Sequence, residues 1–398
     1  MLPDIRVLAA SIAPLAGNSV SGVNPRLLFG LAMAAALLTT TVACGRSDEP
    51  APVLSVEFTQ AVDRLLQQHI PGVQVVVTAD GKDAFHSVGA GNVATGTPIP
   101  DDARIRIASN TKSFVATVVL QLVAEGRVGL DVPVERYLPG VVAGNGYDGN
   151  RITVRNLLQH TGGLPNYLDP DKMANSIGNR HRQPFDTEQV VRETLREKAP
   201  LPGAQPVYSN TGYLLAGLVV ERVTGRSIGT EISKRIIEPL GLSSTYYPEP
   251  GESTLRAPHI HGYDMIDGKL TDVTELDDYG IGGADSALVS TGADLNRFFI
   301  ALLGGRLLAP QLLAEMKSTV PADLPLPGLR GVGLGLFRYE SSCGTEFWGH
   351  GGGAPGFGTL GGVTPDGRAV TLTVNFMPSS EQAMTAISAA RDTALCGR

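Results

Sequence analysis

The sequence lacks the features that mark several large classes of protein. It carries a net charge of -7 and no cluster of lysine and arginine, so it shows no signature of nucleic-acid binding. It has no internal repeat and no long low-complexity tract. What remains is a globular chain of 398 residues with 42% hydrophobic content, which is long enough to bury a sizeable core.

Long apolar runs are also scarce, and the one at Leu27–Leu38 is too short to span a membrane. Its length suits the centre of an export signal, so residues 1–44 are predicted to be one. Thr41 to Cys44 resemble a bacterial lipobox, with Cys44 as the lipidated residue, although leucine is usual at the position of Thr41. The alternative is ordinary cleavage near Ala43. We expect an exported protein, extracellular or in the cell envelope, with Cys44 as a candidate membrane anchor.

Ser109 and Lys112 lie where an apolar segment becomes strongly helical. A serine and a lysine at this spacing on a helix project from the same face. A desolvated lysine amine there can accept the serine proton and create a nucleophile, provided that burial lowers the lysine pKa. The alternative is a serine near a helix start and a solvated lysine.

Tyr208 and Asn210 precede a helical pattern at residues 212–223. A tyrosine hydroxyl beside a lysine can relay protons, and an asparagine amide can hold both a substrate carbonyl and the lysine. The alternative is a pair of residues that only shape the loop.

A third segment begins at Trp348 and continues as His350, Gly351, Gly352 and Gly353, followed by another strand-like stretch. Glycines in a strand allow a substrate backbone to approach closely or form a bulge. The alternative is a plain turn in a chain that contains 48 glycines.

Taken together, in this order and spacing, the three segments resemble the Ser-x-x-Lys, Tyr-x-Asn and His/Lys-x-Gly motifs of the beta-lactamase-related serine hydrolases. That family includes class C beta-lactamases, secreted DD-carboxypeptidases, D-aminopeptidases and certain esterases. The resemblance covers roughly residues 55–396. In motif spacing and in the C-terminal cysteine pair the chain is most similar to the secreted D-alanyl-D-alanine carboxypeptidases.

The pattern of elements and the resemblance predict an α/β (α+β) fold. A helix at 55–68 and a hairpin around Gly81 come first, a helix- and loop-rich region follows, and strands return at 345–377 before a final helix. This order fits an antiparallel sheet flanked by helices, with a mostly helical lobe inserted roughly at 126–298. Residues 45–54 are predicted to be a linker. The resemblance implies a site between the lobes and places His350 on an edge strand facing Ser109.

The resemblance also implies the roles of the motif residues. Ser109 attacks a carbonyl carbon and forms an acyl-enzyme, while Lys112 and Tyr208 share the general-base and general-acid work. Asn210 positions the acyl amide, and His350 tunes the electrostatics around Tyr208 and relays protons. The backbone N–H groups of Ser109 and Gly353 would form an oxyanion hole.

This chemistry needs no metal and no organic cofactor. Six histidines other than His350 show no metal-ligand spacing, since His259 and His261 lie two apart on a loop-like stretch. His160 is expected to be structural.

Two of the three cysteines are expected to pair. If Cys44 is the lipid or cleavage cysteine, then Cys343 and Cys396 remain, and an oxidising compartment favours a disulfide. The resemblance places the strand after Cys343 against the C-terminal helix. The alternative is two buried thiols.

The sequence departs from the carboxypeptidase pattern at positions that hold the substrate carboxylate. Gly351 and Gly353 stand where hydroxyl-bearing residues are usual, and Phe337 stands where those enzymes carry arginine. Arg338 is adjacent, but a shift of one residue on a strand points it to the other face. Arg330 and Arg338 are the residues that could compensate.

Three functions follow. The first is a DD-peptidase of peptidoglycan metabolism. The second is an esterase or D-amino-acid amidase that uses the same acyl-enzyme, with beta-lactam hydrolysis as a variant. The third, a non-enzymatic binding or sensor domain, is disfavoured because all the motif residues are intact. We expect a monomer whose partners are small: a peptide, a beta-lactam or an ester.

Overall fold

The computed structural model describes residues 51–168, 185–199, 207–275, 282–321, 324–378 and 380–397. The predicted export signal and Cys44 lie outside these ranges, so both stay predictions. No helix within the ranges is long and apolar enough to cross a bilayer.

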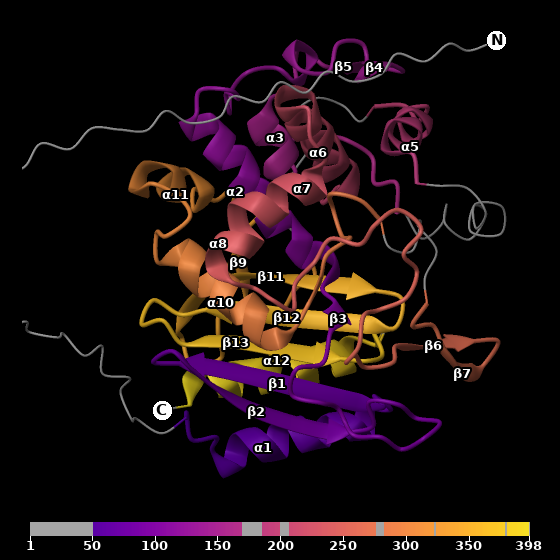
Figure 1. Cartoon of the computed structure of the whole chain (residues 1–398), viewed down its shortest axis with the longest axis vertical. Helices are drawn as coiled ribbons and strands as arrows, with labels where there is room; N and C mark the ends of the chain where they lie inside the picture. The colour runs from indigo at the N-terminus through magenta and orange to yellow at the C-terminus, as the bar shows by residue number, and fades with distance from the viewer. Residues whose placement is uncertain are drawn as a thin grey trace, which may run out of the picture. The chain divides into compact units, whose positions relative to one another are not determined.

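The centre of the fold is a 7-stranded antiparallel sheet in the order β2-β1-β13-β12-β11-β10-β9 (Figure 1). Its strands are β1 (Gly72–Ala79), β2 (Lys82–Gly89), β9 (Leu329–Val332), β10 (Phe337–Glu340), β11 (Glu346–Ala354), β12 (Phe357–Val363) and β13 (Ala369–Val374). The hairpin predicted around Gly81 joins β1 to β2, and the turn at 364–367 joins β12 to β13. Because β1 pairs with β13, the two ends of the domain share one sheet.

One face of the sheet is covered by α1 (Val56–Asp63) and α12 (Glu381–Cys396). Both helices begin at a serine whose hydroxyl accepts a hydrogen bond from a backbone N–H of the first turn, which satisfies one of the free donors there. Phe58 and Ile387 from these helices pack with Val75 of β1 in the same buried cluster.

The opposite face is covered by α10 (Gly292–Leu303), which begins inside the residue range predicted for the helical lobe. Asn296 on α10 fixes the helix to the sheet, donating to the Val76 carbonyl oxygen at 3.0 Å and accepting from the Thr371 hydroxyl at 2.7 Å. Behind α10 runs α2 (Thr111–Ala124), which is almost wholly buried, and Phe114 of α2 stacks on Phe298 of α10.

Short elements surround α2 and form the rest of the chain. The helices are α3 (Val154–Leu158), α5 (Thr187–Thr194), α6 (Asn210–Thr224), α7 (Ile228–Ile232), α8 (Glu238–Leu240) and α11 (Pro310–Met316). The small strands are β3 (Ile105–Arg106), β4 (Ala143–Gly144), β5 (Tyr147–Asp148), β6 (Tyr263–Ile266), β7 (Lys269–Asp272) and β8 (Val289–Ser290). The strongly helical segment expected after Ser109 is α2, and α6 ends at Gly225 in the left-handed conformation, as a helix C-terminus favours.

The prediction that His350 lies on an edge strand was wrong. Strands β10 and β9 extend the sheet beyond β11, because the chain returns from the helical region through this hairpin before it reaches β11. However, β10 pairs only with Glu346–Gly349 of β11. The segment from His350 to Ala354 therefore has no β10 partner and remains open to the site.

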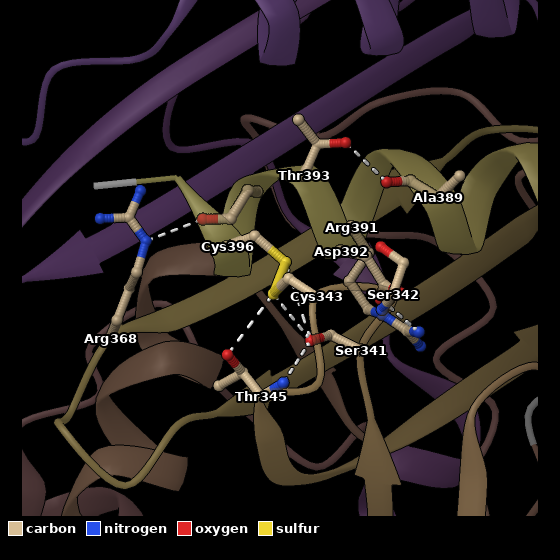
Figure 2. Close-up of a disulfide and its surroundings, with 11 residues drawn as sticks. Ser341, Ser342, Cys343, Thr345, Arg368, Ala389, Arg391, Asp392, Thr393 and Cys396 are labelled. Carbon is tan, nitrogen blue, oxygen red and sulfur yellow. Dashed lines mark hydrogen bonds and ion pairs between the residues drawn. A yellow bond between two sulfur atoms is a disulfide. The ribbon is translucent and has the colours of Figure 1, made fainter.

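A disulfide joins Cys343, in the turn between β10 and β11, to Cys396 at the end of α12 (Figure 2). The Cα atoms are 6.1 Å apart. Two hydrogen bonds beside it also hold the end of α12: the Ser342 N–H of the same turn donates to the Asp392 carboxylate at 2.8 Å, and Arg368, in the turn between β12 and β13, donates to the Ala394 carbonyl at 2.7 Å. The bond therefore pins the end of α12 to the sheet.

Replacing both cysteines by serine is expected to lower the free energy of unfolding by about 2–4 kcal/mol, because the bond closes a separation of 53 residues in the unfolded chain. Urea unfolding of C343S/C396S, compared with the parent before and after reduction, measures this. A double variant as stable as the oxidised parent would contradict it.

Candidate active site

Ser109 lies in a single 3-10 turn, Ala108–Asn110, that leads directly into α2. Ala108, immediately before the serine, has a φ of 45°, which is uncommon for a residue with a side chain. Asn110 stabilises the turn by donating from its side chain to the Ile107 carbonyl at 2.9 Å. Strain of this kind is concentrated at functional sites, where the surrounding structure enforces it.

Lys112 is fully buried one turn further along, and its ammonium donates three hydrogen bonds. The acceptors are the Ser109 hydroxyl at 2.9 Å, the Asn210 side-chain oxygen at 2.6 Å and the Asp285 backbone carbonyl at 2.9 Å. Burial lowers the pKa of Lys112 to about 8, and the negative charge of Asp285 opposes part of this shift. A lysine with such a pKa exchanges protons near neutral pH.

Tyr208 contacts the same serine from the other side. Its phenol donates to the Ser109 hydroxyl oxygen at 2.9 Å, and its ring centroid lies 5.1 Å from the Lys112 nitrogen. Burial raises the pKa of Tyr208 above its usual value, although the hydrogen bond to Ser109 opposes this. The serine oxygen therefore lies between an amine with a lowered pKa and a phenol that keeps its proton.

The third motif brings β11 against the turn that carries Ser109. A Cβ at Gly352 would lie 2.2 Å from the Ile107 carbonyl oxygen and 3.0 Å from the Ser109 nitrogen. No side chain fits in that space, so only glycine permits this contact. At Gly351, by contrast, a Cβ would have its nearest neighbour at 3.5 Å.

His350 is buried and neutral at physiological pH. Burial lowers its pKa to about 3, and the nearby Lys112 charge acts in the same direction. Its Nδ1–H donates to the Gly351 carbonyl, its ring stacks on Phe337 with centroids 4.3 Å apart, and its Nε2 has no partner in the described part of the chain. No hydrogen bond there joins His350 directly to Tyr208, and the proton-relay role of His350 stays a prediction.

Several residues complete the site that the motifs did not reveal. Asn166 accepts a hydrogen bond from the Asn210 amide at 3.0 Å, which turns the Asn210 oxygen toward Lys112. Tyr167 donates to the buried Asp285 carboxylate at 3.0 Å. Asn166 and Tyr167 belong to the run HTGGLPNY, which lies outside the three motifs.

His160, expected to be structural, comes from the same run. It accepts a hydrogen bond from the Ser209 N–H at 3.1 Å, and its ring stacks on Tyr208 with centroids 4.4 Å apart. It adopts a φ of 59° just after α3, where glycine is usual. A histidine there supports the Tyr208 ring, which glycine would not do.

A cavity of about 330 Å³ opens beside Ser109, which is within the ordinary range for ligand sites. Its walls are mostly apolar, and Phe337 is among them. Arg338 is not, because it points to the Arg330 carbonyl, while Arg330 pairs with Glu340 outside the cavity. Neither arginine therefore replaces the missing one.

A family model described as Beta-lactamase matches residues 58–395. The chain belongs to the Beta-lactamase family. It is a serine hydrolase of the superfamily that contains the beta-lactamases and the penicillin-recognising transpeptidases, with the fold that this family implies.

Two solved structures illustrate the similarity. A D-stereospecific amidohydrolase from Streptomyces sp. is 36% identical, with a TM-score of 0.75 over 86% of this chain and 98% of its own. The D-amino acid amidase from Ochrobactrum anthropi SV3, complexed with L-phenylalanine amide, is 28% identical, with a TM-score of 0.74 over 85% and 96%.

Among curated proteins, Protein flp from Staphylococcus aureus (strain NCTC 8325 / PS 47) is 26% identical over 61% of this chain and 48% of its own length. The chain thus spans about half the length of such relatives. Unguisins hydrolase ungD' from Aspergillus campestris (strain IBT 28561) is 27% identical over 86% of this chain and 65% of its own length.

Gly352→Ala is expected to push β11 away from the Ser109 turn and to lower kcat/KM at least about 100-fold, which corresponds to the loss of one oxyanion donor. The decrease is measured as kcat/KM on any ester or amide that the parent enzyme hydrolyses. Gly351→Ala, which has room for its Cβ, serves as the control for folding and is expected to keep the parent melting temperature. A fully active Gly352→Ala enzyme would contradict the role given to this contact.

Proposed function

We propose that the protein hydrolyses amides, and the corresponding esters, of D-amino acids whose leaving group carries no carboxylate. The observation that carries this is Phe337, which lines the cavity where a carboxylate-binding arginine is expected in the carboxypeptidases. This is the second of the three functions that the sequence allowed, and it is preferred here to the DD-peptidase.

The expected loss of carboxylate binding supports the amidase over the DD-peptidase. A hydrogen bond to a charged group contributes about 1.5–3 kcal/mol, and each 1.4 kcal/mol corresponds to a tenfold change in affinity. Phe337 removes one such contact, and Gly351 and Gly353 remove two hydroxyl groups. A free C-terminal D-alanine would therefore bind weakly, whereas an unsubstituted amide would lose nothing.

The names of the similar structures support the same choice. The Streptomyces protein is called a D-stereospecific amidohydrolase and the Ochrobactrum protein a D-amino acid amidase. Both align over most of this chain and nearly all of their own.

We propose a sequence of steps in which protons and bonds balance. Lys112 takes the Ser109 proton as Oγ bonds to the carbonyl carbon, and the developing oxyanion accepts from the Ser109 and Gly353 N–H groups. The C–N bond then breaks, Tyr208 gives its proton to the departing amine, and Lys112 restores the proton of Tyr208. Water cleaves the ester on Ser109 by the same steps, giving the acid. Asn210 holds the acyl part.

A substrate panel tests the proposal. The full chain is expected to hydrolyse D-phenylalanine amide with a kcat/KM at least about 100-fold above that for a peptide ending in D-Ala-D-Ala, because the latter needs the missing carboxylate contacts. L-Phenylalanine amide tests the stereochemistry, and Ser109→Ala is expected to remove hydrolysis.

The same panel includes benzylpenicillin, followed by intact mass. A long-lived adduct on Ser109 together with efficient cleavage of D-Ala-D-Ala would assign the protein to the DD-peptidases instead. Rapid turnover of benzylpenicillin without an adduct would assign it to the beta-lactamases.

The pH dependence of kcat should follow the ionisation of Lys112. Below a pKa of about 8 the amine is an ammonium and cannot accept the Ser109 proton, so kcat is expected to rise with pH between about 6 and about 9. Measuring kcat at saturating substrate excludes titration of the free substrate amine. His350→Gln should keep this rise, because the pKa of His350 is about 3. A flat profile would exclude Lys112 as the base.

A further inference from the structure

The cavity beside Ser109 does not end at the catalytic residues. It continues past Gly351 and Gly353 to the face of the sheet that α12 covers. Neither glycine has a side chain to block the way, and a Cβ at Gly353 would touch the Met377 methyl at 3.4 Å. We call this inner part of the cavity the α12 chamber. Its lining comprises Leu326, Leu360, Met377, Met384, Ser388 and Arg391.

The α12 chamber contains a polar group that the protein does not satisfy. The Ser388 hydroxyl on α12 is buried and has no hydrogen-bond partner in the described part of the chain. The same is true of the Thr359 hydroxyl on β12, which also lines the cavity. Both hydroxyls are neutral, so they add two polar points to the lining without adding a charge.

The chamber offers no free charge for a carboxylate. Arg391 lines it, but its Nε and Nη2 donate to Asp392 at 3.0 and 2.7 Å. The guanidinium also lies against the rings of Tyr339 and Phe347, at 5.4 and 4.7 Å. A pair of opposite charges held in this way favours an uncharged occupant.

The lining of the cavity indicates which part of a substrate would enter. Tyr208, which would protonate the leaving group, and His350 line the cavity beside Ser109. Asn210, which holds the acyl part, is not among the residues that line the cavity. The chamber therefore extends from the side of Ser109 at which the bond breaks and the leaving group departs.

We infer that the α12 chamber is a leaving-group subsite that takes a bulky, uncharged apolar amine or alcohol. The inference rests on the proposed function, since it assigns the second half of the same substrate. Ser388 and Met384, which lie on α12 outside all three motifs, would then determine which leaving groups the enzyme accepts.

The test uses D-phenylalanine joined to three leaving groups: ammonia, 2-phenylethylamine and L-phenylalanine, whose amide keeps a free carboxylate. The 2-phenylethylamide is expected to have a kcat/KM at least about tenfold above that of the other two, because burying a phenyl ring is favourable and a carboxylate is excluded. Acetyl esters are tested in parallel, with 2-phenylethyl acetate compared with ethyl acetate.

Filling the chamber should remove this preference. Ser388→Leu is expected to lower the ratio of kcat/KM for the 2-phenylethylamide to that for the primary amide about tenfold. Ala389→Leu places the same side chain at the neighbouring, exposed position of α12 and should leave the ratio unchanged. Met384→Phe fills the chamber from a second position, so the test holds if Ser388→Leu fails to fold.

The outcomes separate the two proposals. If D-phenylalanine amides are not cleaved but the acetyl esters still show the preference and lose it on filling, the amidase proposal fails and the subsite stands. If the parent shows no preference in either series, or Ser388→Leu and Met384→Phe change only the discrimination between acyl parts, the subsite is overturned. A preference for the L-phenylalanine leaving group would overturn its uncharged character.

Discussion

The burial of the Lys112 ammonium is the interaction on which the site depends. A buried charge is costly unless acceptors surround it, and here they come from three separate segments: Ser109 before α2, Asn210 at the start of α6, and the Asp285 backbone. Because one nitrogen joins all three, the helical elements cannot shift relative to the nucleophile without exposing an unpaired cation. The same burial lowers the pKa of Lys112, so the constraint that assembles the site also prepares its base.

The sequence predicted those parts of the fold that depend on local patterns. The first hairpin, α2, the last three strands and α12 each have their own periodicity and turn residues, and all were found as expected. The position of β11 within the sheet was not predictable in the same way, because it depends on where β9 and β10 pair, and those short strands carry weak signals.

The candidate site was also predicted only in part. Motif spacing pointed to Ser109, Lys112, Tyr208 and Asn210, which the structure brings together. It did not point to Asp285, because the group that Lys112 contacts is a backbone carbonyl that any residue could supply. Nor did it point to the α12 chamber, which is continuous with the space beside Ser109 because Gly351 and Gly353 have no side chains.

The substitution of phenylalanine for arginine at position 337 changes more than the charge of the cavity. The Phe337 ring stacks on His350 and removes it from water, and desolvation is the largest cause of the low pKa of that histidine. An arginine there would instead hold a substrate carboxylate, and its charge would lie beside the imidazole. With Phe337 in place, the third motif presents a neutral ring whose Nε2 can only accept a hydrogen bond. Phe337 therefore contributes both to the weaker carboxylate binding that we propose and to the burial that lowers the pKa of His350. The proposed amide substrate needs neither a carboxylate contact nor a second acid beside Tyr208.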